Sequence, residues 1–201
     1  MMFLLALTML AACAASPQDL SGKMFTFPQE TNRAHVRLNT TMQDFSSVTV
    51  CHRSFTDLRR SHGLFSLATP SSNNEFLIFW SEANKEMQPH IKEGKFRIWR
   101  LWFDGQPSIR KFITSRSNIR GSLIIILGQE QDSHGGGFDI KQSFVGMMTD
   151  VHMWDYVLSP CEIHNYVDEL NFTPGNVLNW RALGFQIIDR VLIEDKFKTC
   201  H

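Results

Sequence analysis

The sequence predicts an all-β fold, a two-sheet jelly-roll β-sandwich with one short α-helix near residues 160–170. Three observations carry this prediction: many short β-branched or aromatic runs, turn residues between them, and one helix-start signal. The chain has 201 residues, 43% of them hydrophobic, which is enough for one sizeable core and too few for two ordinary domains. Basic and acidic residues balance at 20 each, which argues against a dedicated nucleic-acid binder.

The first predicted strands are short runs bounded by polar residues. Residues 45–51 and 75–80 are rich in β-branched and aromatic side chains, as strands are. Residues 100–112 form a predicted hairpin, because Asp104-Gly105 supplies the positive φ angles of a type I′ turn.

Two longer strands are predicted in the second half. Residues 122–127 are apolar on both faces, which is typical of a strand packed on both sides. Residues 143–154 alternate, with one face expected to carry Val145, Met147, Val151 and Met153.

One helix is expected among the strands. Ser159 is a good N-cap, Pro160 suits the first helical position, and Glu162 completes a capping box. The helix is predicted to run to about Leu170, before Pro174 and Gly175, and strands resume near residues 177 and 185.

The amino terminus predicts secretion. Residues 3–15 form an apolar run too short to span a bilayer as a helix, and small residues follow it. We expect residues 1–16 to be a signal peptide, cleaved near Ala15 or Ser16, ahead of one domain over residues 17–201. The alternative is a frayed core strand at the terminus.

Secretion bears on the cysteines and on glycosylation. Once a signal peptide carrying Cys13 is removed, Cys51, Cys161 and Cys200 remain, and an odd number leaves one thiol free or paired between chains. Asn39 and Asn171 begin glycosylation sequons and are candidate sites for glycans.

The most informative segment is the glycine-rich loop at residues 128–142. Hard calcium takes six to eight oxygen ligands, and a flexible loop can wrap to offer them. The alternative is a plain solvated hairpin loop. The oxygen-bearing residues of the loop that are candidate calcium ligands are Glu130, Gln131, Asp132, Asp139 and Gln142.

The two neighbouring acids of the same loop are also the residue types of a glycosidase pair. Neighbouring acids on one strand serve as nucleophile and acid/base in jelly-roll glycosidases. Here Glu130 and Asp132 are followed by Gly135 where a third acid would be needed, so the acid/base is missing and no enzyme is expected.

Residues 126–136 resemble the calcium loop of the pentraxin family. The resemblance extends over residues 45–58, 74–81, 153–163 and 176–183. Residues 19–24 are most similar to mucosal members. The resemblance implies a flattened jelly roll, two adjacent calcium ions per subunit and a disc-shaped pentamer. It also implies recognition of phosphocholine, phosphoethanolamine or carbohydrate through the calcium face, in innate or mucosal immunity.

The resemblance also assigns roles to single residues. Asn73 stands where aspartate is usual, Asp139 stands where glutamate is usual, and Phe79 matches the aromatic position that packs on choline methyls, although it could equally be a core phenylalanine. The first calcium would take Asn73, Asn74, Glu130, the Gln131 carbonyl and Asp132, while the second would share Glu130 and Asp132 and add Asp139 and Gln142.

The chain departs from the family between residues 82 and 101. It is short there by about one hairpin of residues, and the missing part holds the usual disulfide partner of Cys51 and the acid that meets a choline nitrogen. We expect residues 82–92 not to replace the missing strands. Two classes of function stay open: a calcium-dependent recognition protein, or a disabled product without a competent fold.

Overall fold

A computed structural model of the chain describes residues 16–91, 98–108, 111–112 and 118–197. The expected signal peptide, apart from Ser16, lies outside these residues, and so does Cys200. Cys51 and Cys161 are both described, and each is a free thiol.

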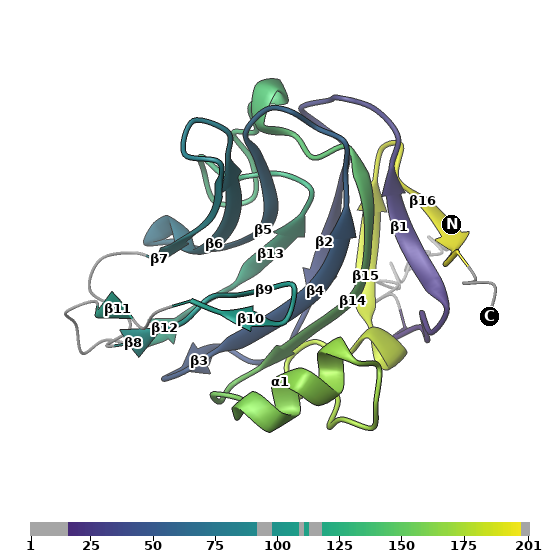
Figure 1. Ribbon diagram of the computed structural model, residues 1–201. Coiled ribbons are helices and arrows are strands. Elements are labelled where there is room, and N and C mark those ends of the chain that lie inside the picture. Colours follow the sequence, from purple (N-terminus) through teal and green to yellow (C-terminus); the bar gives the residue numbers. More distant parts are fainter. Residues whose placement is uncertain (1–15, 92–97, 109–110, 113–117, 198–201) are drawn as a thin grey trace, which may run out of the picture.

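The molecule is a sandwich of two antiparallel sheets, as predicted (Figure 1). The four-stranded sheet has the order β16 (Leu192–Asp195), β1 (Lys23–Phe27), β14 (Gly146–Trp154) and β4 (Thr49–Phe55). The six-stranded sheet has the order β15 (Gly184–Ile188), β2 (His35–Asn39), β13 (Ile124–Leu127), β5 (His62–Thr69), β6 (Ser72–Ser81) and β7 (Glu86–Ile91).

Short elements complete the fold. Three two-stranded pairs are β3 (Asp44–Phe45) with β12 (Ile119–Arg120), β8 (Ile98–Trp99) with β11 (Lys111–Phe112), and β9 (Trp102–Phe103) with β10 (Gln106–Pro107). The helices are the 3-10 helices η1 (Ile140–Gln142) and η2 (Trp180–Ala182) and the α-helix α1 (Pro160–Val167). In Figure 1, η1 and α1 lie at opposite ends of the molecule.

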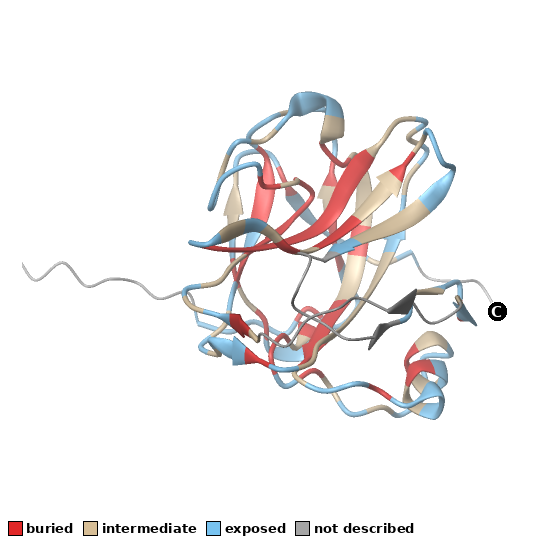
Figure 2. Cartoon of the chain, turned by 90° about the vertical axis from the view of Figure 1, so that its left-hand side faces the viewer, coloured by how far each residue is buried: buried red, intermediate tan, exposed pale blue. Residues whose placement is uncertain are grey.

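The core fills the space between the two sheets, where Figure 2 shows most of the buried residues. Phe25 of β1 is fully buried, and its ring contacts Trp180 and Phe185 edge-on, each at 5.1 Å between centroids. Burying one such side chain stabilises the fold by about 1.5–3 kcal/mol. These contacts join the four-stranded sheet to β15 of the other sheet.

The predicted strand at residues 122–127 is confirmed as β13. It lies between β2 and β5, and Ile125 and Leu127 have no exposed surface. A strand with neighbours on both edges and packing on both faces needs apolar residues at every position, which explains its unbroken apolar run.

The alternation predicted for residues 143–154 is wrong in its first half. Met148 is fully buried, whereas Val145 and Met147 are only half-buried. The pairing of β14 with β4 shifts between Thr149 and His152, and Asp150 has a φ of 54°. The irregularity moves the inward face by one residue, as a β-bulge does.

The predicted strand at residues 45–51 is divided. β3 ends at Phe45 and β4 begins at Thr49, with irregular chain between them. The Asp104-Gly105 turn is confirmed, with φ angles of 47° and 72°, but the strands that it joins have only two residues each. A strand resumes at Gly184, whereas residue 177 lies outside any strand.

The capping box of α1 is present as predicted. Ser159 Oγ accepts from the Glu162 backbone N–H at 3.3 Å, and Glu162 accepts from the Ser159 backbone N–H at 2.8 Å. The helix ends at Val167 rather than near Leu170. Glu169 adopts a left-handed φ of 55°, so the chain cannot continue as a right-handed helix.

The expectation that residues 82–92 do not replace the missing strands is wrong in one respect, because these residues contain β7 (Glu86–Ile91). This strand pairs with β6 over six residues, from Ser81 opposite Glu86 to Phe76 opposite Ile91. β7 is at the edge of its sheet, where a backbone N–H that faces outward makes no hydrogen bond to another strand. Pro89, which has no N–H, is therefore tolerated there. Residues 82–92 therefore supply one strand of the six-stranded sheet.

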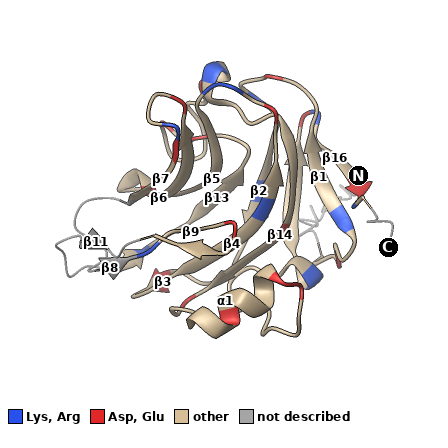
Figure 3. Ribbon diagram, in the orientation of Figure 1, with Lys and Arg blue, Asp and Glu red and all other residues tan. Residues whose placement is uncertain are grey.

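Charged residues lie mainly in loops and near strand ends, and much of the strand surface and of α1 is uncharged (Figure 3). Among the described residues, no helix is both long enough and apolar enough to cross a membrane.

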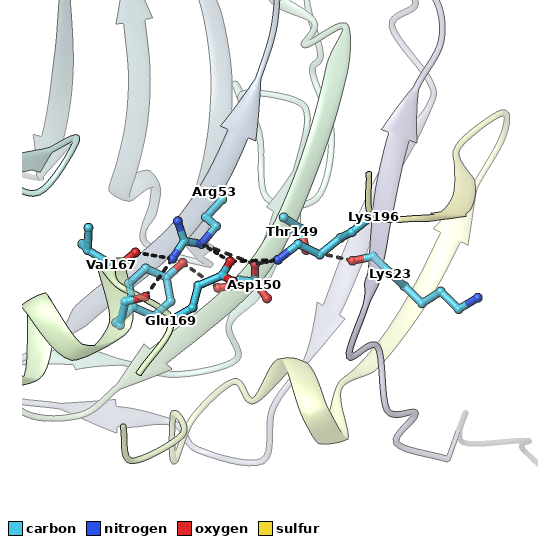
Figure 4. Close-up of polar contacts among 8 residues, drawn as sticks. Lys23, Arg53, Thr149, Asp150, Val167, Glu169 and Lys196 are labelled. Atoms are coloured by element: carbon cyan, nitrogen blue, oxygen red, sulfur yellow. Dashed lines mark hydrogen bonds and ion pairs between the residues drawn. The ribbon is translucent and has the colours of Figure 1, made fainter. Parts of the chain in front are cut away.

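The end of α1 is tied to the four-stranded sheet by a charged cluster that we call the α1 clamp, made of Arg53, Asp150, Glu169 and Lys196 (Figure 4). Arg53 Nη2 donates to the Tyr166 and Val167 carbonyls, each at 2.8 Å, and so satisfies the open end of the helix. Lys196 Nζ lies 2.8 Å from Asp150 and 3.2 Å from Glu169. The clamp joins β4, β14, α1 and the chain after β16.

We predict that His152 makes the fold sensitive to acid. The side chain is 2% exposed, Gly175 N–H donates to its Nδ1 at 3.2 Å, and burial lowers its pKa to about 4. The unfolded chain therefore takes up the proton first, so stability falls as the pH drops from about 6.5 to about 4, by about 3 kcal/mol. Urea unfolding in EDTA across this range measures the loss.

The matched variant is His152→Asn, which keeps an acceptor for Gly175 but has no titrating ring. Asp150 and Arg181 are the charged groups that act on His152, and both remain in the variant. Equal pH slopes for the variant and the parent would contradict the prediction.

Candidate calcium site

The structure brings together two segments that are distant in sequence. Asn73 and Asn74 lie near the start of β6, and the acidic loop follows β13. Asn73 Nδ2 donates to the Asp132 carbonyl at 2.6 Å, and Asn74 Nδ2 donates to Glu130 Oε1 at 3.3 Å. The two asparagines therefore meet the first two acids of the loop.

The loop is held in place by side-chain hydrogen bonds that the sequence did not predict. Gln131 is fully buried, and its side-chain N–H group donates to the Ser66 and Ile124 carbonyls, each at 3.1 Å. Its side-chain oxygen accepts from Gly135 N–H at 2.9 Å. The side chain of Gln131 thus braces the loop, which leaves its backbone carbonyl as the group proposed for calcium.

A second brace is Gln129, which precedes the acids. It is buried, and its side chain donates to the Thr31 carbonyl at 2.8 Å and the Ala34 carbonyl at 3.0 Å. Because its hydrogen-bond partners lie far away in the sequence, local patterns gave no signal for this role.

Two glycines allow the chain to approach the acids closely. A Cβ at Gly63 of β5 would lie 2.9 Å from the Glu130 backbone nitrogen. Gly137 has a φ of 75°, and a Cβ there would lie 3.0 Å from Asp132 Cβ. A side chain at either position would displace an acidic residue of the site.

The acids of the loop act on one another. Burial raises the pKa of Glu130, and the nearby charges of Asp132 and Asp139 raise it further. Three carboxylates in one small region repel each other unless a cation lies between them. The electrostatics therefore favour a bound cation.

Two oxygens of the predicted ligand set lack any hydrogen-bond partner. They are Asn74 Oδ1 and Gln142 Oε1, and both are buried. A buried acceptor without a donor is costly, and a cation satisfies it as well as an N–H group does. The residues present therefore fit a hard, oxygen-bound cation such as calcium.

The remaining predicted ligand is placed by η1. Asp139 is the N-cap of this 3-10 helix, and its Oδ1 accepts from Lys141 N–H at 2.9 Å. The described residues contain no group of three or more His, Cys, Asp and Glu side chains placed to hold a metal. Calcium would therefore depend on amide and backbone oxygens in addition to the carboxylates.

Phe79 lies on β6, beyond Asn74. It is half-buried, and its ring contacts His90 of β7 edge-on at 6.1 Å. Gln88 is opposite Phe79 in the ladder, and Glu86 follows on the same face of β7. The predicted glycosylation residues Asn39 and Asn171 are both exposed.

Comparison with known proteins identifies the family. A profile of the Pentaxin family matches residues 23–96 and 90–195. The chain belongs to the pentraxin family. The two matched segments of this pentraxin overlap at residues 90–96.

Individual relatives support this family assignment. C-reactive protein of Cavia porcellus is 39% identical, with 88% of each chain covered. Serum amyloid P-component of Sus scrofa is 35% identical over 91% of this chain and 92% of the relative. The solved heptameric SAP-like pentraxin from Limulus polyphemus matches with a TM-score of 0.70 at 22% identity, covering 88% of this chain and 96% of that one, and so supports the fold.

Proposed function

We propose that this pentraxin is a secreted, calcium-dependent recognition protein and not an enzyme. The observation that carries the proposal is the pair of unpartnered oxygens, Asn74 Oδ1 and Gln142 Oε1, beside mutually repelling carboxylates. The proposed subunit holds two calcium ions through Asn73, Asn74, Glu130, Gln131, Asp132, Asp139 and Gln142.

The proposed ligands are phosphocholine, phosphoethanolamine or carbohydrate. When bound, calcium supplies a positive charge with open coordination positions for phosphate or hydroxyl oxygens. Phe79 offers an aromatic surface for the methyl groups of a cationic head group. Glu86, on the same side of the β6–β7 pair, is the acid that we propose to face the ammonium charge.

We further propose that subunits assemble as a homo-oligomer, with the pentamer as the expected form. The similarity to a heptameric pentraxin supports ring assembly. We also propose export into the extracellular space and lectin-like ligand binding in innate or mucosal immunity, and the family membership supports this proposal. Asn39 and Asn171 are exposed and available for glycans after export.

The alternative is a disabled pentraxin product. It is favoured by two observations: Cys51 is a free thiol, and β4 lies at the edge of its sheet. Losing a native disulfide from a secreted domain costs about 2–5 kcal/mol. A disabled product would be retained in cells or would aggregate, whereas the recognition protein would be released in soluble form.

The test is retention of the released chain on phosphoethanolamine-agarose. We expect retention in calcium and complete elution by EDTA. Retention that EDTA leaves unchanged, or no soluble chain, would contradict the proposal. Hydrolysis of a panel of β-glucans would instead support the glycosidase alternative, for which Gly135 leaves the acid/base position empty.

A charge-restoring variant tests the ligand assignment. Asn73→Asp with Asp139→Glu adds one negative charge and one methylene of reach, so calcium should bind about tenfold more tightly, equal to about 1.4 kcal/mol. Calorimetry measures the dissociation constant. Weaker or unchanged binding would mean that these two positions are not ligands.

A further inference from the structure

The strand β4 leaves one side of the four-stranded sheet open. It pairs with β14 along its length and is last in the sheet order, so its outer backbone groups have no strand partner among the described residues. Among the described residues β9 pairs with β10 and not with β4, and Trp102 and Cys51 pack against the same apolar cluster around Trp154 and Tyr166. An open edge is a template for another strand.

This edge lacks the usual protection. β7, at the end of the other sheet, carries Glu86 and Pro89, and β16 carries Glu194 and Asp195. β4 has seven residues with no proline, lysine or acid. Its one charged residue, Arg53, has its guanidinium engaged by Asp150 and Glu169 of the α1 clamp, as Figure 4 shows.

Exposed apolar side chains lie at both ends of the same strand. Phe55, at the end of β4, is 67% exposed. At the beginning, Thr49 Oγ1 donates to the Tyr156 carbonyl at 2.7 Å, which places Tyr156 and Val157 there. These two are 37% and 74% exposed.

We infer that β4 pairs antiparallel with β4 of a second copy of this chain, around a twofold axis at His52. In this register each Phe55 lies opposite Thr49 of the second copy, next to its exposed Tyr156 and Val157. The two exposed apolar ends therefore cover each other, and both open edges are closed by one contact. A twofold contact of this kind is self-complementary and closes after two copies.

The register makes the contact non-covalent. Cys51 lies opposite Arg53 of the second copy, so the two free thiols do not face each other. The contact uses none of the proposed calcium ligands. It therefore forms without calcium and without a disulfide, and it is distinct from a ring contact.

The test is sedimentation of the full released chain, in EDTA and reductant, over a range of concentrations. We expect a reversible, concentration-dependent doubling of the mass of the sedimenting species. Hydrogen exchange should show protection of β4 backbone amides that rises with concentration. Phe55→Asp should weaken association by about tenfold or more, because it places a charge at the covered apolar end.

The matched control is Leu192→Asp. It introduces the same charge at an exposed apolar residue of β16, the opposite edge of the same sheet, and should leave association unchanged. Circular dichroism and thermal unfolding confirm that both variants fold. A mass that does not change with concentration, a dimer that Phe55→Asp leaves intact, or a dimer that reductant separates would each overturn the inference.

Discussion

Replacing Glu130 with glutamine should weaken calcium binding by about a hundredfold or more, equal to about 2.7 kcal/mol. Glu130 is the proposed ligand common to both ions, and its carboxylate accepts from Asn74 beside two further acids. The variant keeps the size and hydrogen-bonding capacity of the side chain but removes its charge. Isothermal titration calorimetry measures the change directly.

The same variant should behave in the opposite way without calcium. In EDTA, removing one of three repelling carboxylates should stabilise the fold by about 1 kcal/mol. In the parent, calcium at a hundred times its dissociation constant should add about 2.7 kcal/mol, and the variant should lack this gain. Thermal unfolding with and without calcium separates the two effects.

Glu194→Gln is the matched control for Glu130→Gln. Glu194 is an exposed acid on β16, and its change should alter neither calcium affinity nor the calcium-dependent stabilisation. If Glu130→Gln and Glu194→Gln bind calcium equally well, the loop after β13 is not the calcium site.

Replacing Arg53 with methionine should destabilise the fold by about 2–3 kcal/mol. Arg53 makes the two hydrogen bonds that satisfy the last carbonyls of α1, and it lies 3.5 Å from Asp150. Its side chain is 32% exposed, so the ion pairs alone are worth less than in a buried cluster. Because whole-domain stability is about 5–15 kcal/mol, this loss should reduce the yield of folded chain.

The comparison is with Lys196→Met, which removes the other cation of the α1 clamp. The side chain of Lys196 donates hydrogen bonds to carboxylates and not to the carbonyls at the end of α1. The variant therefore leaves the helix end capped, and its free energy of unfolding should fall by about 1 kcal/mol or less. Urea unfolding in EDTA measures both variants. Equal losses would show that capping of α1 by Arg53 contributes nothing beyond charge. Calcium affinity of the folded Arg53→Met chain should match the parent.

Much of the fold follows from patterns within a few residues. The apolar run of β13, the capping box at Ser159 and the Asp104-Gly105 turn were each predicted from sequence and are confirmed. Each depends on local rules: burial of both faces, satisfaction of the first helical N–H groups, and positive φ angles.

Long-range contacts decided the features that the sequence predicted wrongly. The irregularity at Asp150 reverses the inward face in the first part of β14, and Arg53 of β4 helps to end α1 at Val167. β7 forms because it pairs with the edge of β6 over six residues. β4 is distant in sequence from β14 and α1, so periodicity and propensity carried no signal for those two features, whereas β7 is joined to β6 by the short turn at residues 82–85.

The candidate calcium site likewise combines features that the sequence determined with features that only the tertiary structure decided. The sequence by itself determined the oxygen-bearing residues and, through family resemblance, their proposed assignment to calcium. Only the tertiary structure placed Asn74 against Glu130, buried Asn74 Oδ1 and Gln142 Oε1 without donors, and left the edge of β4 open. The physical reason is that residue type fixes which bonds an atom can make, whereas the packing of distant segments decides which of those bonds remain unmade.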